Sequence, residues 1–309
     1  MENRGKLRTV VEYSAARLLL SSLELLPRPL AIRASCAMAQ IAYLVSWKLR
    51  RIGELNLKMA FPEMSRRERS RLLRDSIVNL GRHLGEFSRF STITPEILRK
   101  TIDCEGLDNL DAAQALGRGV IMITGHLGAW EMGSLALSAF GYPFELLVRR
   151  IENSAIERLI DNTRTRFGNR TIDKRSAARS MLTTLRKGGM LGLLVDINVV
   201  RNKGIFVDFF GVPASTTFIA AKLALRTGAA VVPIFVPWEE RRQRFVMHIG
   251  APLTIECSGD EEKDIRQLTS RFTKTVEDYV RRYPDQWLWI HKRWRTRPVG
   301  EQNFYHTVT

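Results

Sequence analysis

The sequence predicts an α/β protein with a mostly parallel mixed sheet flanked by helices. Short apolar runs recur between about residues 119 and 249, and the first of them, Gly119–Thr124, is rich in β-branched residues, which is typical of a buried strand. Segments with helical periodicity lie between these runs. Because strand and helix alternate along the chain, we expect parallel strands joined by helical crossovers.

The N-terminal part is predicted to be helical. Two apolar segments, Val10–Leu26 and Ala34–Trp47, are separated by Pro27-Arg28-Pro29 and indicate a helical hairpin. The second segment has 14 residues without a formal charge, whereas a spanning helix needs about 20 apolar residues. A hairpin in the membrane interface, one arm that just spans, and a buried helix pair in a soluble protein all fit this pattern. We divide the chain into a membrane-associated helical segment, residues 1–50, and an α/β domain, residues 51–309.

The remaining elements follow in order. Ser65 and Glu68 form a capping-box pattern for a helix from about Arg66 towards Phe90, and Thr94-Pro95-Glu96 begins a short helix. Strands are expected over 119–124, 145–148, 191–195, 229–236 and 245–249, the last antiparallel and at an edge. Helices are expected over 129–140, 154–167, 176–187, 218–227 and 264–282.

Composition limits the function classes. The chain has 309 residues, 45% of them hydrophobic and 26% charged, and a formal net charge of +16. This composition excludes a disordered basic tail, and a mean hydropathy of −0.14 argues against a polytopic membrane protein. The positive charge indicates an anionic partner, which is nucleic acid, an acidic membrane surface or a phosphorylated substrate. Cys36, Cys104 and Cys257 form no CxxC pair, so we expect free thiols.

The residues that follow the first predicted buried strand are candidates for a catalytic site. Gly125-His126-Leu127-Gly128-Ala129-Trp130-Glu131 lies at the carboxyl end of that strand, where α/β sheets bind ligands. His126 and Glu131 are five residues apart and would not share a face of one helix. They meet only if His126 precedes the helix and Glu131 lies in its first turns. A histidine and a carboxylate there suit general-base catalysis, whereas the spacing alone, which is short and common, favours a core histidine with a chance glutamate nearby.

Other chemistries lack their motifs. The chain has neither G-x-S-x-G nor G-x-x-x-x-G-K-[ST], so we expect neither an α/β-type serine hydrolase nor a P-loop enzyme. None of the five histidines is paired at metal-ligand spacing. We therefore expect no metal and no cofactor.

Five ordered blocks carry a family resemblance that covers nearly the whole chain. They are Asn56-Leu57 with Ala60-Phe61-Pro62, Thr124–Glu131, Val148-Arg149, Gly204–Gly211, and Tyr283–Trp289 followed by His291, Arg293-Trp294 and Arg297-Pro298. With these blocks the chain resembles the lipid A late acyltransferases, the lauroyl and myristoyl transferases of Gram-negative bacteria. The resemblance implies a fold like that of the glycerol-phosphate acyltransferases.

The resemblance also implies a reaction. His126 would act as general base on an acceptor hydroxyl, with Glu131 as its partner. The hydroxyl would attack an acyl thioester on acyl carrier protein without a covalent acyl-enzyme, and the acceptor would be a phosphorylated glycolipid, the lipid A precursor. Backbone N–H groups near Gly128 are candidates to bind the oxyanion.

Further residues take their expected roles from the same resemblance. Arg149 would contact an anionic substrate group, with Arg150 as the alternative, because neighbouring strand residues face opposite ways. Asp196 would orient the substrate or an arginine, or form a structural ion pair. Trp287, Trp289 and Trp294, interleaved with cations, suit a membrane interface, although core positions are the commoner role for single tryptophans.

The resulting expectation is an O-acyltransferase at the inner membrane that faces the cytoplasm and binds no nucleic acid. Two alternatives stay open at this point. The same chemistry would serve another acceptor, such as a phosphoinositol mannoside or a phospholipid precursor. A non-catalytic protein that binds membrane surfaces or nucleic acid through its basic charge is a different class of answer.

Overall fold

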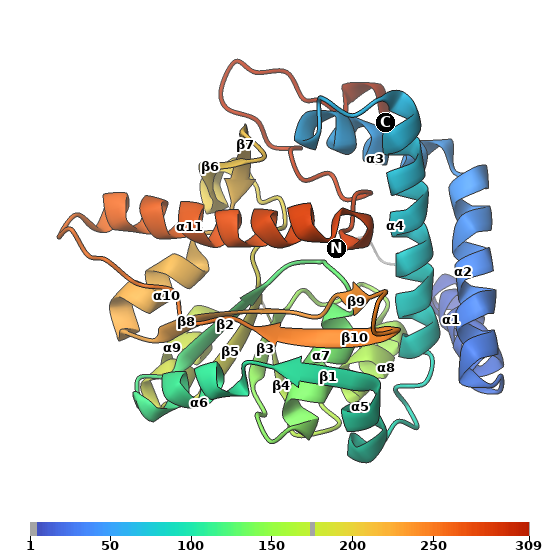
Figure 1. Ribbon diagram of the computed structural model, residues 1–309, viewed down its shortest axis with the longest axis horizontal. Helices are drawn as coiled ribbons and strands as arrows, with labels where there is room; N and C mark the ends of the chain where they lie inside the picture. The colour runs from blue at the N-terminus through green and yellow to red at the C-terminus, as the bar shows by residue number, and fades with distance from the viewer. Residues whose placement is uncertain (1–4, 174–176, 309) are drawn as a thin grey trace.

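A central sheet organises the molecule, as the computed structural model of residues 5–173 and 177–308 shows (Figure 1). Its strand order is β1-β10-β8-β2-β5-β3-β4, and the two-residue β9 pairs with β10. The strands are β1 (Ile102–Glu105), β2 (Val120–Thr124), β3 (Glu145–Val148), β4 (Arg170–Asp173), β5 (Met190–Leu194), β8 (Ala230–Phe235), β9 (Trp238–Glu239) and β10 (Arg244–Ile249). The five strands from β8 to β4 are parallel, and β10 is antiparallel to β8. The predicted mostly parallel mixed sheet is confirmed.

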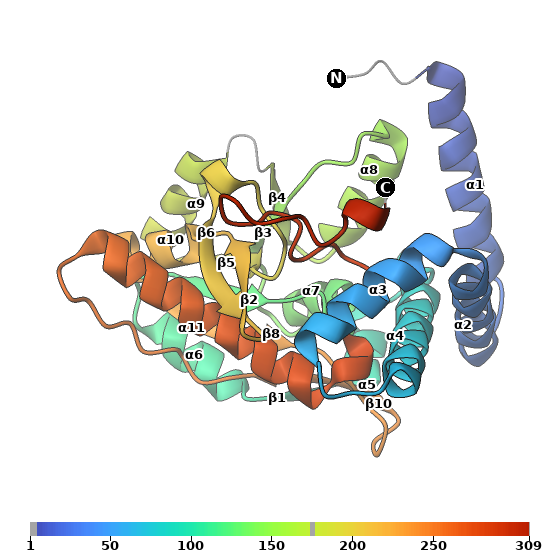
Figure 2. The same ribbon diagram turned by 90° about the horizontal axis from the view of Figure 1, so that it is seen from above.

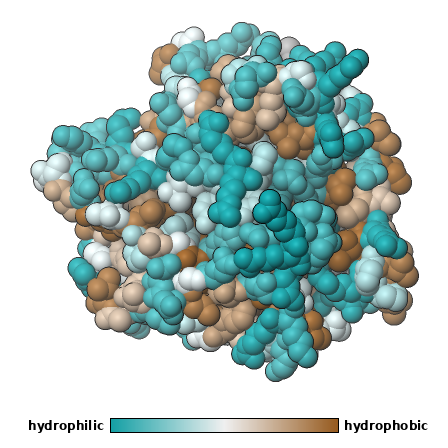
Figure 3. Space-filling view, in the orientation of Figure 1, coloured by the Kyte–Doolittle hydropathy of each residue, from teal (hydrophilic) through white to brown (hydrophobic). Residues whose placement is uncertain are grey.

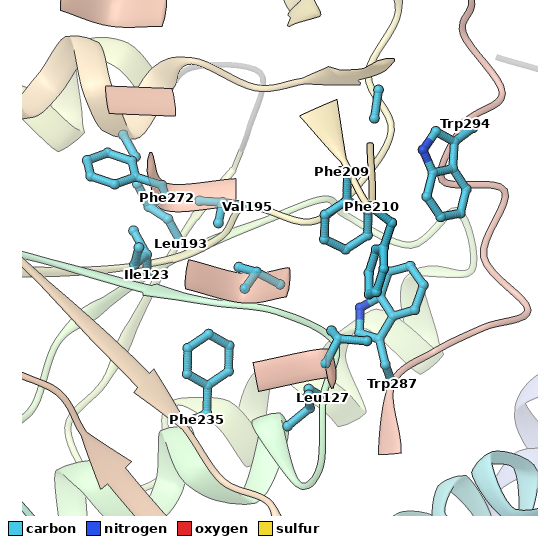
Figure 4. Packing of buried hydrophobic residues seen from close by; sticks show 14 of the residues in the cluster. Ile123, Leu127, Leu193, Val195, Phe209, Phe210, Phe235, Phe272, Trp287 and Trp294 are labelled. Atoms are coloured by element: carbon cyan, nitrogen blue, oxygen red, sulfur yellow. The ribbon is translucent and has the colours of Figure 1, made fainter. Parts of the chain in front are cut away.

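Helices cover both faces of this sheet. One face carries α5 (Pro95–Thr101), α6 (Leu107–Ala115) and α7 (Trp130–Ala139), with α8 (Ser154–Arg164) beside α7; the other carries α9 (Ala177–Arg186), α10 (Ile219–Thr227) and α11 (Glu261–Arg282). Strand β2 shows the alternation that two apolar layers require. Val120 and Met122 pack in one core cluster, whereas Ile121 and Ile123 pack in the other. Figure 4 shows Ile123 in the second cluster, with Leu193 and Phe272.

Most predicted elements agree with the structure to within a few residues, but β10 is corrected in one respect. It is antiparallel to β8 as expected, yet it does not lie at the edge of the sheet, because β1 pairs with it on the outside. Strands β1 and β4, which have four residues each, and α6 were not predicted from the sequence. The separate hairpin of β6 (Ile205–Phe209) and β7 (Val212–Thr216) was not predicted either. Ser176, the expected start of α9, lies outside the described residues.

Four helices form the N-terminal part. They are α1 (Lys6–Glu24), α2 (Arg28–Val45), α3 (Trp47–Ala60) and α4 (Arg66–Phe87), so the division expected after residue 50 falls inside α3. Figure 2 shows three of them, α1, α2 and α4, together at one end of the molecule. The capping box of Ser65 and Glu68 at the start of α4 is confirmed. Gly81 and Gly85 let α2 approach α4 closely, because a Cβ at either position would lie 2.8 Å from the α2 backbone.

The outer face of α2 is mostly apolar, although Arg33 and Gln40 are also exposed. Its exposed side chains include Leu30, Met38, Ile41, Leu44 and Val45, and Figure 3 shows apolar side chains along the right-hand edge, where Figure 1 places α2. Within the described residues, no single helix combines the length and hydropathy of a membrane span; α2 and α3 reach them only together, and they are bent by 89° at their junction. Membrane association of the N-terminal helices stays a prediction.

Candidate active site

His126 lies in the loop between β2 and α7, at the carboxyl end of a central strand. The C-terminal segment holds this loop in place, since the amide of Leu288 donates to the carbonyl of His126 at 3.1 Å and Leu127 forms an antiparallel bridge with Trp287. Gly128 has a φ of +62°, and a Cβ at this position would collide with the carbonyl oxygen of Val236. Only glycine fits both constraints without strain. The loop therefore delivers His126 before the helix and Glu131 in its first turn, as predicted.

The hydrogen-bond partner of His126 is Asp196, which follows β5. The Nδ1 atom of His126 lies 2.8 Å from Oδ1 of Asp196, and the backbone N–H of His126 donates to Oδ2 at 2.7 Å. The side chain of Asp196 is 2% exposed and that of His126 is 22% exposed. Because the carboxylate accepts a hydrogen bond from the N–H at Nδ1, Nε2 is the ring nitrogen that is left for a substrate.

His126 and Asp196 each shift the pKa of the other. Burial lowers the pKa of His126, but the charge and hydrogen bond of Asp196, together with the charge of Glu131, raise it above its ordinary value. Burial of Asp196 opposes ionisation, but His126 and the hydrogen bonds that the carboxylate accepts hold its pKa well below the usual range. Asp196 is therefore a permanent anion that favours the imidazolium form of His126.

The expectation that Glu131 is the direct partner of His126 is wrong in geometry. Arg164 of α8 binds both carboxylate oxygens of Glu131, with Nε 2.9 Å from Oε2. Adjacent strands explain the difference. Strands β2 and β5 pair directly, so the residues after their carboxyl ends meet, whereas Glu131 in the first turn of α7 faces the neighbouring helix α8. Glu131 still raises the pKa of His126 through its charge.

The two candidate arginines have different surroundings. Arg150 forms ion pairs with Glu157 at 2.9 Å and Asp161 at 3.0 Å. The Glu157 carboxylate also accepts the backbone N–H of Ile151 at 2.6 Å, which fixes the loop after β3. Arg149 is exposed, and within the described part of the chain it has no hydrogen bond or ion pair. Arg149 is therefore the cation of the two that is available to a ligand.

Three of the backbone donors near Gly128 are already used. The N–H groups of Leu127, Gly128 and Ala129 donate to the carbonyls of Gly125, Gln286 and Val236 at 2.8, 3.0 and 2.8 Å. These three groups cannot bind an oxyanion while their bonds hold the loop, so the expected oxyanion donors are limited to the N–H groups in the first turn of α7.

The three C-terminal tryptophans are core residues. Trp287, Trp289 and Trp294 are at most 2% exposed, which contradicts a place at the membrane interface. They pack with Phe209 and Phe210 of the β6–β7 hairpin and cover the carboxyl ends of the strands (Figure 4). These positions were not predicted from the sequence, because the hairpin that packs against the tryptophans was not among the predicted elements.

Comparisons with known proteins show the family of the chain. A family model of bacterial lipid A biosynthesis acyltransferases matches residues 2–296. The chain belongs to this family. It is 30% identical to the lipid A biosynthesis palmitoleoyltransferase of Escherichia coli K12 over 255 residues, 82% of this chain and 81% of the relative. It is 27% identical to the lauroyltransferase of the same organism, over 91% of this chain and 90% of the relative. It is also 28% identical to the phosphatidylinositol mannoside acyltransferase of Mycobacterium tuberculosis, over 71% and 69%. The protein is therefore an acyltransferase.

Two further histidines of this acyltransferase lie beside the site and were not among the predicted site residues. The Nδ1 atom of His83, in α4, lies 3.0 Å from the carbonyl oxygen of Gly128 and must donate to it. His291 accepts the backbone N–H of Asn198 at Nε2, 3.2 Å away, and burial lowers its pKa to about 4. Both rings are neutral at pH 7, since burial also lowers the pKa of His83, so neither competes with His126 for a proton.

A mostly apolar cavity of about 90 Å³ opens next to this chemistry. Trp130, whose ring lies 5.2 Å from that of His126, forms part of its wall, and Glu131 and Arg164 also line it. The remaining wall comes from α7 and the strands beneath it, and includes Met122, Leu137, Phe144, Leu146, Gly192 and Ile234. Among the described residues, no group of three or more His, Cys, Asp or Glu side chains is arranged to hold a metal ion.

Proposed function

We propose that this acyltransferase moves a fatty acyl chain from an acyl carrier protein thioester to a hydroxyl of a lipid A precursor. The observation that carries the proposal is the pair of His126 and buried Asp196, which leaves Nε2 of a histidine for the acceptor hydroxyl beside an apolar cavity. The named activities of the relatives support the lipid A precursor as acceptor.

The reaction follows from this pair. Nε2 of His126 takes the proton of the acceptor hydroxyl while the hydroxyl oxygen attacks the thioester carbonyl carbon. Asp196 stabilises the imidazolium that forms. When the tetrahedral intermediate collapses, the carbon–sulfur bond breaks and the leaving thiolate takes the proton from Nε2. No protein nucleophile is acylated in this scheme, so donor and acceptor must be bound at the same time.

We assign substrate contacts to two places in the structure. Exposed Arg149 would bind an anionic group of the acceptor, because a guanidinium matches phosphate with two parallel hydrogen bonds. The apolar cavity would hold the first part of the acyl chain. A cavity of about 90 Å³ is smaller than the engineered one of about 150 Å³ that binds benzene, so a long chain requires the cavity to widen.

Membrane association completes the proposal. The apolar outer face of α2 with exposed Trp47, and the net charge of +16, suit an acidic lipid surface. An acidic carrier protein would be attracted by the same charge. We place the enzyme on this basis at the cytoplasmic face of the inner membrane.

A transfer assay tests the chemistry. Purified protein receives acyl carrier protein loaded with a fatty acid, and either tetra-acylated lipid A precursor or phosphatidylinositol mannoside as acceptor. Mass spectrometry should show acylated lipid A precursor with the wild type and none with His126→Ala. His248→Ala is the matched control, because the His248 ring is also bonded to a carboxylate, that of Glu239 at 3.1 Å. No transfer by the wild type, or full transfer by His126→Ala, contradicts the proposal. Transfer to phosphatidylinositol mannoside alone would make the mannoside the acceptor in place of the lipid A precursor.

A sedimentation assay tests the membrane surface. Vesicles of anionic lipid should carry the protein down, and replacing Leu44 and Val45 with serine should weaken this binding even in high salt, where charge is screened. The matched control replaces Val299, which is 82% exposed but lies in the C-terminal segment. Equal binding of all three proteins contradicts the assignment of α2.

A further inference from the structure

Trp287 contacts the hydrogen-bonded pair at the centre of the site. Its indole Nε1 donates to Oδ2 of Asp196 at 2.8 Å, and the side chain is buried. Oδ2 also accepts the backbone N–H of His126, and Oδ1 faces the imidazole Nδ1. Within the described residues, Trp287 is thus the one side chain other than His126 that donates a hydrogen bond to this carboxylate.

The donor at this position is well suited to orient a carboxylate. An indole N–H only donates and does not titrate, so its bond to Asp196 is the same in every protonation state of His126. The ring is also fixed in place, since it lies 4.7 Å from that of Trp289 and 5.4 Å from that of Phe209 between centroids. Figure 4 shows Trp287 beside Leu127 and the two phenylalanines of the β6–β7 hairpin.

We propose that Trp287 is a positioning residue for acyl transfer, which acts by holding the Asp196 carboxylate in the plane that binds Nδ1 of His126. This inference rests on the proposed function of His126 and adds a residue to it. A carboxylate fixed at one oxygen by two donors presents the other oxygen to the imidazole in a single orientation. That orientation keeps the proton on Nδ1 and leaves Nε2 directed at the acceptor hydroxyl.

The test compares two substitutions that differ in one contact. Trp287→Phe removes the N–H that reaches Asp196, whereas Trp289→Phe removes an equally buried N–H that donates to the carbonyl of Pro284 at 2.6 Å. We expect Trp287→Phe to lower kcat by about 10- to 100-fold with KM unchanged, the usual range for loss of a partner that orients a site residue. Trp289→Phe should leave both constants within about threefold of the wild type. Melting temperatures of both variants show how much stability each loses with its indole ring.

A double substitution separates action through Asp196 from a general loss of packing. If Trp287 acts through the carboxylate, Trp287→Phe combined with Asp196→Asn should be no slower than Asp196→Asn alone. Should Trp287→Phe not fold, replacing Trp287 with β-(3-benzothienyl)alanine keeps the ring volume and removes only the N–H. Equal kcat for the two tryptophan variants, or losses that multiply in the double variant, overturn the inference. Absence of transfer by the wild type instead overturns the proposed function.

Discussion

Asp196→Asn is the substitution that tests the mechanism most directly. Asparagine has nearly the same shape as aspartate but no charge, so the imidazolium that forms during proton transfer loses its counter-ion. Oδ1 and Nδ1 are 2.8 Å apart, and two unit charges centred about 4 Å apart interact by about 4 kcal/mol at an effective dielectric constant of about 20. Because about 1.4 kcal/mol corresponds to a tenfold change, we expect kcat to fall by about 10³-fold.

The pH dependence of the same variant gives an independent result. Asp196 raises the pKa of His126, whereas burial lowers it. Without the carboxylate the lowering by burial prevails, so the pKa of His126 should fall and the acidic limb of the kcat/KM profile should move to lower pH. The assay is transfer of a labelled acyl group between about pH 5 and pH 9.

A matched control separates this effect from the loss of a buried carboxylate in general. Asp264 is 3% exposed and accepts hydrogen bonds from Ser258 at the start of α11, far along the chain from His126. Asp264→Asn should leave kcat and the pH profile unchanged even where it lowers the melting temperature. If Asp196→Asn retains kcat within tenfold of the wild type, or its acidic limb does not move, the assignment of Asp196 as the orienting partner is refuted.

Three further predictions follow from the same geometry. Glu131→Gln keeps a hydrogen-bond acceptor for Arg164 but removes a charge that acts on His126 from a distance. We therefore expect kcat to fall by about tenfold, much less than in Asp196→Asn. Equal losses of kcat in steady-state assays of the two variants would contradict this ranking. Gly128→Ala should destabilise the protein in thermal unfolding by more than Gly117→Ala, because both glycines have positive φ but only the Cβ at Gly128 collides with backbone, and equal losses of about 1–2 kcal/mol would assign the cost to φ alone. Histidine resonances in NMR titrations should place the pKa of His291 at about 4 and that of His126 above the ordinary value of a histidine, and a titration of His291 near neutral pH would contradict its burial.

The net charge of +16 has more than one use in the structure. Arg293 is fully buried and bonds to the carbonyl of Ser215 and the hydroxyl of Thr216 at 3.0 and 2.6 Å, which fixes the C-terminal segment to the β6–β7 hairpin. Arg164 is committed to Glu131, and Arg150 to two acids of α8. Arg149 is the exposed cation that follows β3. A count of charges thus overstates what is available to a ligand, because part of the charge holds the site together.

Much of the architecture was predictable because its signals are local. Short apolar runs identified β2, β3, β5 and β8, and the Ser65–Glu68 capping box placed the start of α4. Strands β1 and β4 were missed because each has two charged residues among its four, so neither shows the apolar run that identified β3, a strand of the same length.

The site, like the fold, has features that were predictable from the sequence and others that were not. The sequence by itself determined that His126 follows a buried strand at the ligand-binding edge of an α/β sheet, with glycines that permit the turn and Glu131 in the helix beyond. Only the tertiary structure decided that Asp196, 70 residues away in the chain, is its hydrogen-bond partner. It also turned Trp287 inward to that carboxylate and committed Glu131 to Arg164. The physical reason is that strand order in a sheet, which decides which strand ends are neighbours, is set by packing between distant segments and leaves no periodic trace in either one.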